Sequence, residues 1–116
     1  MNIVIPSEIH PAENRVALLP EHVARLVEKG AQIAVESGIG KTLNIPDEEY
    51  KKVGASIESD RHQLYQQADM VLQIRKPAIE DVALLKEKSI YVSLMDPFNE
   101  RELIEAFGEK GVTSIF

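Results

Sequence analysis

Three segments of the sequence repeat the same order of a helix end, a glycine and the start of a strand. They span residues 29–33, 53–57 and 110–113, with glycine at positions 30, 54 and 111. Glycine suits the left-handed residue that closes a helix, so each segment predicts a joint between a helix and the following strand. Joints of this kind are typical of αβ units, which build a mostly parallel sheet through right-handed crossovers. The unequal intervals between the joints argue against a solenoid.

The pattern of apolar residues agrees with this prediction. Short apolar runs rich in β-branched residues predict buried strands at 3–5, 33–35, 70–72 and 90–92, and the last residues, 112–116, predict one more strand. Helical spacing predicts four helices between them, with the apolar faces Val23-Leu26-Val27, Leu64-Tyr65-Ala68, Ile79-Val82-Leu85 and Leu103-Ile104-Phe107. Pro20 suits the first turn of the first helix, and Asn99 is the expected cap of the last. We therefore expect an α/β domain of three layers with an open, mostly parallel sheet, Rossmann-like or flavodoxin-like.

Length, charge and cysteine content restrict the functional classes. A chain of 116 residues suits one domain with one sizeable core. The net charge of -6 and the scattered acidic residues argue against a nucleic-acid surface. The absence of cysteine excludes disulfides, thiolate metal ligands and a cysteine nucleophile. No apolar run approaches the ~20 residues needed to span a bilayer, so we expect no direct membrane insertion.

A glycine-containing loop, residues 37–42, partly matches two nucleotide-binding motifs. Gly40-Lys41-Thr42 matches the end of a phosphate-binding loop, but Val35 stands where that motif requires glycine. Gly38 and Gly40 have the spacing of the dinucleotide fingerprint, but Leu43 occupies the third glycine position. No helix is expected directly after Thr42. The loop is therefore interpreted as a strand-to-helix connection and not as a nucleotide site.

Two arginines follow predicted strands, where open α/β sheets bind ligands. Arg15 lies beyond the first strand, and its planar guanidinium suits a carboxylate or phosphate. Arg75 and Lys76 end the strand at 70–72 and would lie beside Arg15 in such a sheet. The simpler alternatives are a surface salt bridge for Arg15 and a solvated strand end before Pro77 for the other two.

Asp96, after the strand at 90–92, is compatible with two roles. It suits a general base or an orienting group for a neighbouring cation, and equally the cap of the next helix. His10, His22 and His62 fall on separate elements and lack the spacing of a metal site. His22 and His62 are expected on helix surfaces.

Several motifs occur in the order of one known family. The series begins with residues 3–8 and 13–18 and Pro20, continues through 35–40, 47–50, 54–55 and 68–72, and ends with 110–113. It resembles the N-terminal domain of alanine dehydrogenases and NAD(P) transhydrogenase alpha subunits. The resemblance covers nearly the whole chain, and the ordered series is more specific than any one motif.

The resemblance implies roles for three residues. In alanine dehydrogenases this domain supplies an arginine and a lysine that hold the substrate, and a histidine for proton transfer. Arg15 matches the arginine, whereas Arg75 stands at the lysine position and Asp96 at the histidine position. These two substitutions remove the tunable ammonium and the imidazole, which disfavours alanine dehydrogenation. Arg15, Arg75 and Asp96 are the substrate-binding candidates.

The resemblance is closer to the transhydrogenase alpha subunit, because that family does not require the lysine and histidine and because residues 34–38 read closer to it. It implies hydride transfer between NAD(H) and NADP(H), coupled to proton movement through membrane subunits. On this interpretation residues 1–116 are an N-terminal domain truncated before its dinucleotide-binding domain. The residues that bind NAD(H) are therefore expected beyond Phe116, and this chain is not expected to bind NAD(H) tightly or to be active alone.

The same resemblance implies partners and leaves two alternatives. The expected partners are the rest of the alpha subunit and the membrane and NADP-binding subunits, in a homo-oligomer at the cytoplasmic face. The alternatives are an alanine dehydrogenase-like domain and a stand-alone binding module.

Overall fold

A computed structural model describes residues 1–8, 15–75, 77–93 and 101–115 of the chain. Strands and helices alternate along nearly all of it. In order they are β1 (Asn2–Ile5), α1 (Pro20–Glu28), β2 (Gln32–Glu36), the short 3-10 helix η1 (Lys41–Leu43), α2 (Asp47–Lys52), β3 (Ser56–Glu58), α3 (Arg61–Gln66), β4 (Met70–Leu72), α4 (Ile79–Val82), β5 (Ile90–Val92), α5 (Arg101–Lys110) and β6 (Thr113–Ile115). Among these helices none is both long and apolar enough to cross a membrane.

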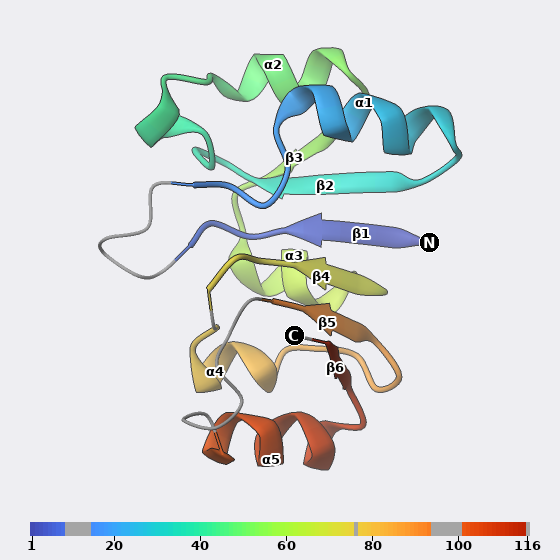
Figure 1. Ribbon diagram of the computed structural model, residues 1–116, viewed down its shortest axis with the longest axis vertical. Coiled ribbons are helices and arrows are strands. Elements are labelled where there is room, and N and C mark those ends of the chain that lie inside the picture. The colour runs from blue at the N-terminus through green and yellow to red at the C-terminus, as the bar shows by residue number, and fades with distance from the viewer. Residues whose placement is uncertain (9–14, 76, 94–100, 116) are drawn as a thin grey trace.

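The six strands form one parallel sheet in the order β3-β2-β1-β4-β5-β6 (Figure 1). This order confirms the predicted Rossmann-like α/β fold. The chain builds outward from β1 to β3, then returns through α3 to place β4 on the other side of β1. In the registers, Ile3 lies opposite Ile33 of β2 and opposite Met70 of β4. The strand order therefore reverses between β1 and β4, where sheets of this kind form a crevice beyond the carboxyl ends of the strands.

The predicted joints are present at all three positions. Gly30, Gly54 and Gly111 have φ angles of 95°, 102° and 74°, and each ends a helix before β2, β3 or β6. These angles favour glycine because a Cβ atom crowds the backbone there. The prediction from local sequence therefore holds at the three turns for which it was made, before β2, β3 and β6.

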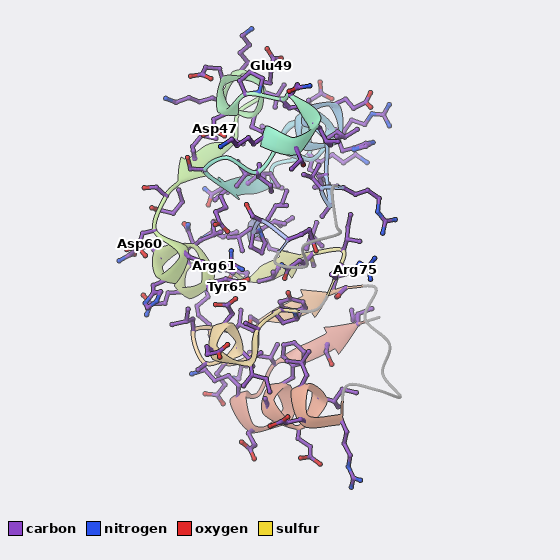
Figure 2. The ribbon with its side chains drawn as sticks, turned by 90° about the vertical axis from the view of Figure 1, so that its left-hand side faces the viewer. Asp47, Glu49, Asp60, Arg61, Tyr65 and Arg75 are labelled. Carbon is purple, nitrogen blue, oxygen red and sulfur yellow. The ribbon has the colours of Figure 1, made fainter. Side chains whose placement is uncertain are left out.

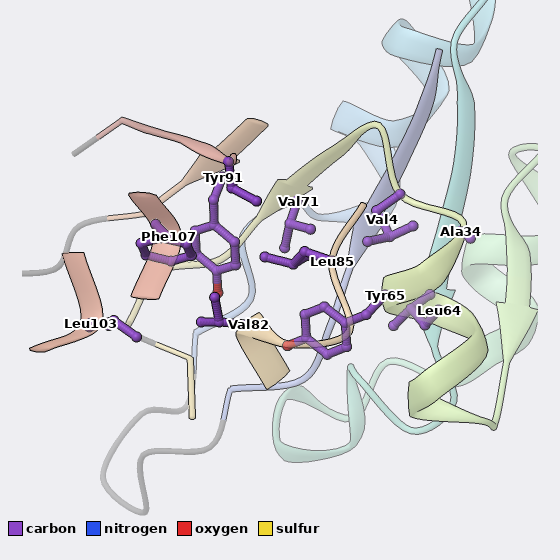
Figure 3. Close-up of a cluster of buried hydrophobic side chains, with 12 residues drawn as sticks. Val4, Ala34, Leu64, Tyr65, Val71, Val82, Leu85, Tyr91, Leu103 and Phe107 are labelled. Carbon is purple, nitrogen blue, oxygen red and sulfur yellow. The ribbon is translucent and has the colours of Figure 1, made fainter. Parts of the chain in front are cut away.

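The sheet separates two apolar clusters, and alternate residues of the central strands supply them. The first contains Val4, Ala34, Val71 and Tyr91 on the face covered by α3, α4 and α5 (Figure 3). In it the rings of Tyr91 and Phe107 lie 5.1 Å apart between centroids. The second is formed by Ile3, Ile5, Val23, Ile33, Val35, Ile39, Tyr50 and Ala55, under α1 and α2. Both faces of the central strands are buried, which explains their continuous apolar runs.

One prediction about a helix needs correction. Ile79 was expected on the buried face of its helix, but it is 44% exposed, while Val82 and Leu85 are buried as expected. Helix α4 ends at Val82, so Leu85 reaches the core from the turn that follows and the helical face does not extend to it. No α-helix directly follows Thr42, as expected, because the short η1 covers Lys41–Leu43 and α2 begins only at Asp47.

Two predictions at the ends of elements lie outside the described residues. One is the cap of the last helix, expected at Asn99. The other is the last residue of the final strand, Phe116, since β6 is described as Thr113–Ile115. The expectation that the NAD(H)-binding residues lie beyond Phe116 therefore stays a prediction.

Candidate functional site

The carboxyl ends of β1 and β4 define the site where the sheet order reverses. Two loop segments meet there, Ser7-Glu8 after β1 and Gln73-Ile74-Arg75 after β4. The amide of Gln73 joins them, because its Nε2 donates to the Ser7 carbonyl at 3.2 Å. Figure 2 looks onto this edge of the sheet, with Arg75 at one side. We call this pair of segments the switch-point site.

Glu8 makes the strongest contacts between the two segments. Its carboxylate accepts the backbone N–H of Ile74 at 2.8 Å and that of Arg75 at 2.7 Å. Hydrogen bonds to a charged acceptor are shorter and stronger than neutral ones. Glu8 is separated from these two partners by 66 and 67 positions along the chain, so the contact fixes one loop on the other.

Hydrogen bonds from buried polar side chains also hold the segment that follows β4. Burial raises the pKa of Tyr91, so its hydroxyl remains protonated and donates to the Gln73 side-chain oxygen. Ser93, also buried, donates its hydroxyl to the Arg75 carbonyl at 3.2 Å. Arg75 is therefore held through both its N–H and its carbonyl, although the residue as a whole is exposed.

Arg15 lies at the same edge of the sheet. It is exposed and lines a small pocket of about 110 Å³, together with Glu8, which follows β1, and Thr42 of η1. Glu8 thus borders the pocket of Arg15 and binds the main chain of Arg75. The structure brings these two predicted site residues to one edge, as the parallel sheet led us to expect. Their role in substrate binding stays a prediction. Lys76 and Asp96 lie outside the described residues.

The glycine loop after β2 is closed by Asp47, the first residue of α2. The Asp47 carboxylate accepts the N–H of Gly38 at 2.9 Å and the hydroxyl of Ser37 at 3.0 Å. A Cβ atom on Gly40 would lie 2.6 Å from the Ile45 carbonyl oxygen, so this position requires glycine for close packing. The N–H of Gly38, which a bound phosphate would need as a donor, is already hydrogen-bonded to the Asp47 carboxylate. The loop therefore has a structural explanation, in agreement with the prediction.

A cluster around Arg61 was not anticipated from the sequence. Its guanidinium donates to Glu36 at the end of β2 and to Asp81 of α4, the latter at 3.1 Å. It also lies over the ring of Tyr65, 5.3 Å from the centroid. The side chains of Glu36, Arg61 and Asp81 are only 19%, 24% and 13% exposed. In Figure 2 Arg61 and Tyr65 lie on the opposite side of the sheet edge from Arg75. The cluster is connected to the switch-point site through Glu36, whose carboxylate accepts the N–H of Ser7.

The histidines and acidic residues give no sign of a metal centre in the described ranges of the chain. No group of three or more metal-ligating side chains occurs there. His22 and His62 are exposed on α1 and α3, as predicted. His22 also caps its helix, because its Nδ1 accepts the N–H of Leu19 at 3.1 Å. His10 lies outside the described residues.

Comparison with known proteins decides the family. The domain family described as "Alanine dehydrogenase/PNT, N-terminal domain" matches residues 4–116. The chain belongs to this family. The match confirms the resemblance found in the ordered motifs.

Relatives of both enzyme types are similar to this chain. An alpha-subunit polypeptide of NAD(P) transhydrogenase from Rhodospirillum rubrum is 34% identical over 98% of the chain and 31% of the relative. Alanine dehydrogenase from Bacillus subtilis is 35% identical over 99% of the chain and 30% of the relative. The crystal structure of transhydrogenase from Sinorhizobium meliloti has a TM-score of 0.91 at 32% identity, covering 98% of this chain and 34% of that one. The chain therefore spans about a third of the length of these relatives.

Proposed function

We propose that residues 1–116 are the N-terminal domain of the NAD(H)-binding alpha subunit of an NAD(P) transhydrogenase. The observation that carries this proposal is the character of the charges at the switch-point site. At this edge Arg15 and Arg75 supply fixed positive charge, and Arg75 stands where the resemblance to alanine dehydrogenases implies a lysine. Arginine remains protonated in proteins and does not exchange a proton during a reaction.

Fixed positive charge that exchanges no proton suits hydride exchange between nucleotides. Reduction of NAD⁺ by NADPH moves a hydride from one nicotinamide ring to the other, and neither ring gains or loses a proton at the reacting carbon. Dehydrogenation of an amino acid also needs a group that takes up a proton. Fixed positive charges can hold an anionic substrate in either reaction, but they supply proton transfer in neither. Arg75 in place of a lysine therefore favours the transhydrogenase.

Under this proposal a dinucleotide-binding domain follows Phe116 in a longer protein and holds NAD(H). The partners are the rest of the alpha subunit and the membrane and NADP-binding subunits, within a homo-oligomer at the cytoplasmic face of a membrane. Arg15, Arg75 and Asp96 are the proposed substrate-binding residues, with the arginines facing the anionic substrate. This chain alone is expected to bind NADH only weakly and to be inactive.

The test is an assay of the longer protein, combined with the NADP-binding subunit. We expect NADPH-dependent reduction of an NAD⁺ analogue whose reduced form absorbs at its own wavelength. Arg15→Ala should raise KM for the analogue, because it removes a charge from the substrate site. A longer reading frame without a dinucleotide-binding domain, or a full complex without hydride exchange, would contradict the proposal.

Alanine dehydrogenase is the second candidate, because the relative from Bacillus subtilis is as similar to this chain as the transhydrogenase subunit is. NADH oxidation that depends on pyruvate and ammonia would favour this candidate. The third is a stand-alone binding module, which predicts specific binding of a small carboxylate by the chain and no turnover in any longer form.

A further inference from the structure

We propose that Glu8 is the positioning residue of the switch-point site, because it fixes the main chain from which the side chain of Arg75 extends toward an anionic ligand. This inference rests on the proposed function, in which Arg15 and Arg75 contact the anionic substrate. Glu8 itself is assigned no contact with that substrate. Its effect is transmitted through the main chain of Arg75.

The first argument is the geometry of the contact. One carboxylate accepts two successive backbone N–H groups, those of Ile74 at 2.8 Å and Arg75 at 2.7 Å. A carboxylate can accept both bonds, since it has two acceptor oxygens and no donor. A glutamine amide offers one oxygen, and its NH₂ group would face an N–H of the main chain. The contact therefore requires the carboxylate, and an amide of the same shape does not replace it.

The second argument is that the main chain of Ser7, directly before Glu8, is itself held in place. The N–H of Ser7 donates to Glu36 at 3.0 Å, and the Ser7 carbonyl accepts the Gln73 side chain at 3.2 Å. Glu36 is in turn paired with Arg61. Because the main chain beside Glu8 is held in this way, the two loops have little freedom to shift together, and Glu8 can fix the position of the Arg75 main chain.

The third argument is what the anchor holds. Arg75 is bound at its N–H by Glu8 and at its carbonyl by the Ser93 hydroxyl, 3.2 Å away, yet the residue is exposed. β4 ends at Leu72, so the sheet no longer fixes the chain at position 75. The Glu8 contact takes over that role. The long side chain of Arg75 therefore extends from a main chain whose place is fixed.

The proposal and simple electrostatics predict opposite effects of one substitution. Glu8→Gln removes a negative charge beside Arg15 and Arg75, so charge alone predicts tighter binding of an anion. Positioning predicts weaker binding, since Arg75 loses its anchor. Glu8→Asp keeps the charge but shortens the side chain, and positioning predicts weaker binding there also.

The experiment uses the 116-residue chain labelled with ¹⁵N, titrated with pyruvate and separately with NADH into the millimolar range. Amide spectra report both folding and the dissociation constant of each probe. We expect Glu8→Gln and Glu8→Asp to raise the constant about threefold or more, the size of one lost hydrogen bond. Glu28→Gln, at the exposed end of α1, is the charge-matched control and should leave it unchanged.

A double-mutant cycle with Arg75→Ala separates positioning from general damage. If Glu8 acts through Arg75, Glu8→Gln has no further effect in the Arg75→Ala background. Tighter or unchanged binding in Glu8→Gln and Glu8→Asp, or full additivity with Arg75→Ala, overturns this inference and leaves the proposed site standing. If neither probe binds the wild-type chain in the millimolar range, the inference fails, but the proposed function, which expects the NAD(H)-binding residues beyond Phe116, does not. If Arg15→Ala and Arg75→Ala do not weaken binding, the proposed site fails and the inference fails with it. Should Glu8→Gln not fold, Glu8→Asp decides.

Discussion

The guanidinium of Arg61 lies 3.1 Å from the carboxylate of Asp81, which connects the start of α3 to α4. Arg61 also pairs with Glu36, so one cation serves two carboxylates that are largely removed from solvent. Because Glu36 belongs to β2 and α4 follows β4, the cluster joins the parts of the domain that lie on either side of β1.

We expect Arg61→Met to destabilise the domain by about 2 kcal/mol or more, because it leaves two partly buried carboxylates without their cation. Partial exposure of the cluster keeps the effect below that of a fully buried pair. Urea unfolding measures the change in free energy. Arg101→Met is the matched control, since Arg101 pairs with Glu105 on the surface of α5 and its side chain is 91% exposed. It should cost less than about 0.5 kcal/mol, and equal losses in the two variants would contradict this account.

Two glycine positions should respond to alanine in opposite directions. Gly40→Ala places a Cβ atom 2.6 Å from the Ile45 carbonyl oxygen, a backbone atom that cannot simply move aside. We expect a loss of about 2 kcal/mol. Gly108 lies within α5 with nothing within 4 Å of its missing Cβ atom, so Gly108→Ala should stabilise by about 0.5–1 kcal/mol. Thermal unfolding of both variants decides, and a stable Gly40→Ala would remove the packing explanation of that glycine.

Asp69 should contribute to the acid sensitivity of the domain. The backbone N–H of Asn2, followed by Lys86, stabilises its carboxylate and lowers the pKa of Asp69 below the ordinary value of 3.8. The unfolded chain therefore binds this proton at a higher pH than the folded one. The contribution is fully present above the unfolded pKa and is lost as pH falls toward the folded pKa. Asp69→Asn should flatten the dependence of unfolding free energy on pH in this acid range, and an unchanged slope would argue against the Asp69 contact.

Tyr50 should hold the segment that follows Arg15. Its side chain is fully buried, and its hydroxyl donates to the Leu18 carbonyl at 2.9 Å. Tyr50→Phe keeps the ring but leaves that carbonyl without this donor, so we expect a loss of about 1 kcal/mol. Equilibrium unfolding in urea measures it. Stability equal to that of the wild type would show that water replaces the hydroxyl at no cost.

The sequence was sufficient for features that depend on neighbouring residues. Each glycine joint could be predicted because the left-handed conformation of Gly30 or Gly54 is a local preference. The apolar runs predicted the strands, since a parallel sheet buries both faces. The exposure of Ile79 escaped prediction because helical periodicity does not show that α4 is only four residues long and begins at Ile79 itself.

The contacts of the switch-point site could not be predicted in the same way. Glu8 and Arg75 are separated by 67 positions, and Arg61 and Glu36 by 25. Nothing in the sequence around Glu8 or Glu36 distinguishes these acidic residues from surface residues. The expectation that Arg15 and Arg75 share an edge came from the topology of parallel sheets, which orders strand ends without specifying which side chains meet there.

β1 pairs with both β2 and β4, with Ile3 opposite Ile33 and Met70, and this pairing also affects the order of folding during synthesis. β1 is the first strand of this domain to leave the ribosome, yet its second neighbour is made only after two further strands and three α-helices. During synthesis one side of β1 has no partner while the first half of the domain is already complete. We therefore expect folding to be governed by the late arrival of β4, because pairing of segments so distant in the chain is slow. β1, although made first, thus becomes fully paired only after β2, which is made later.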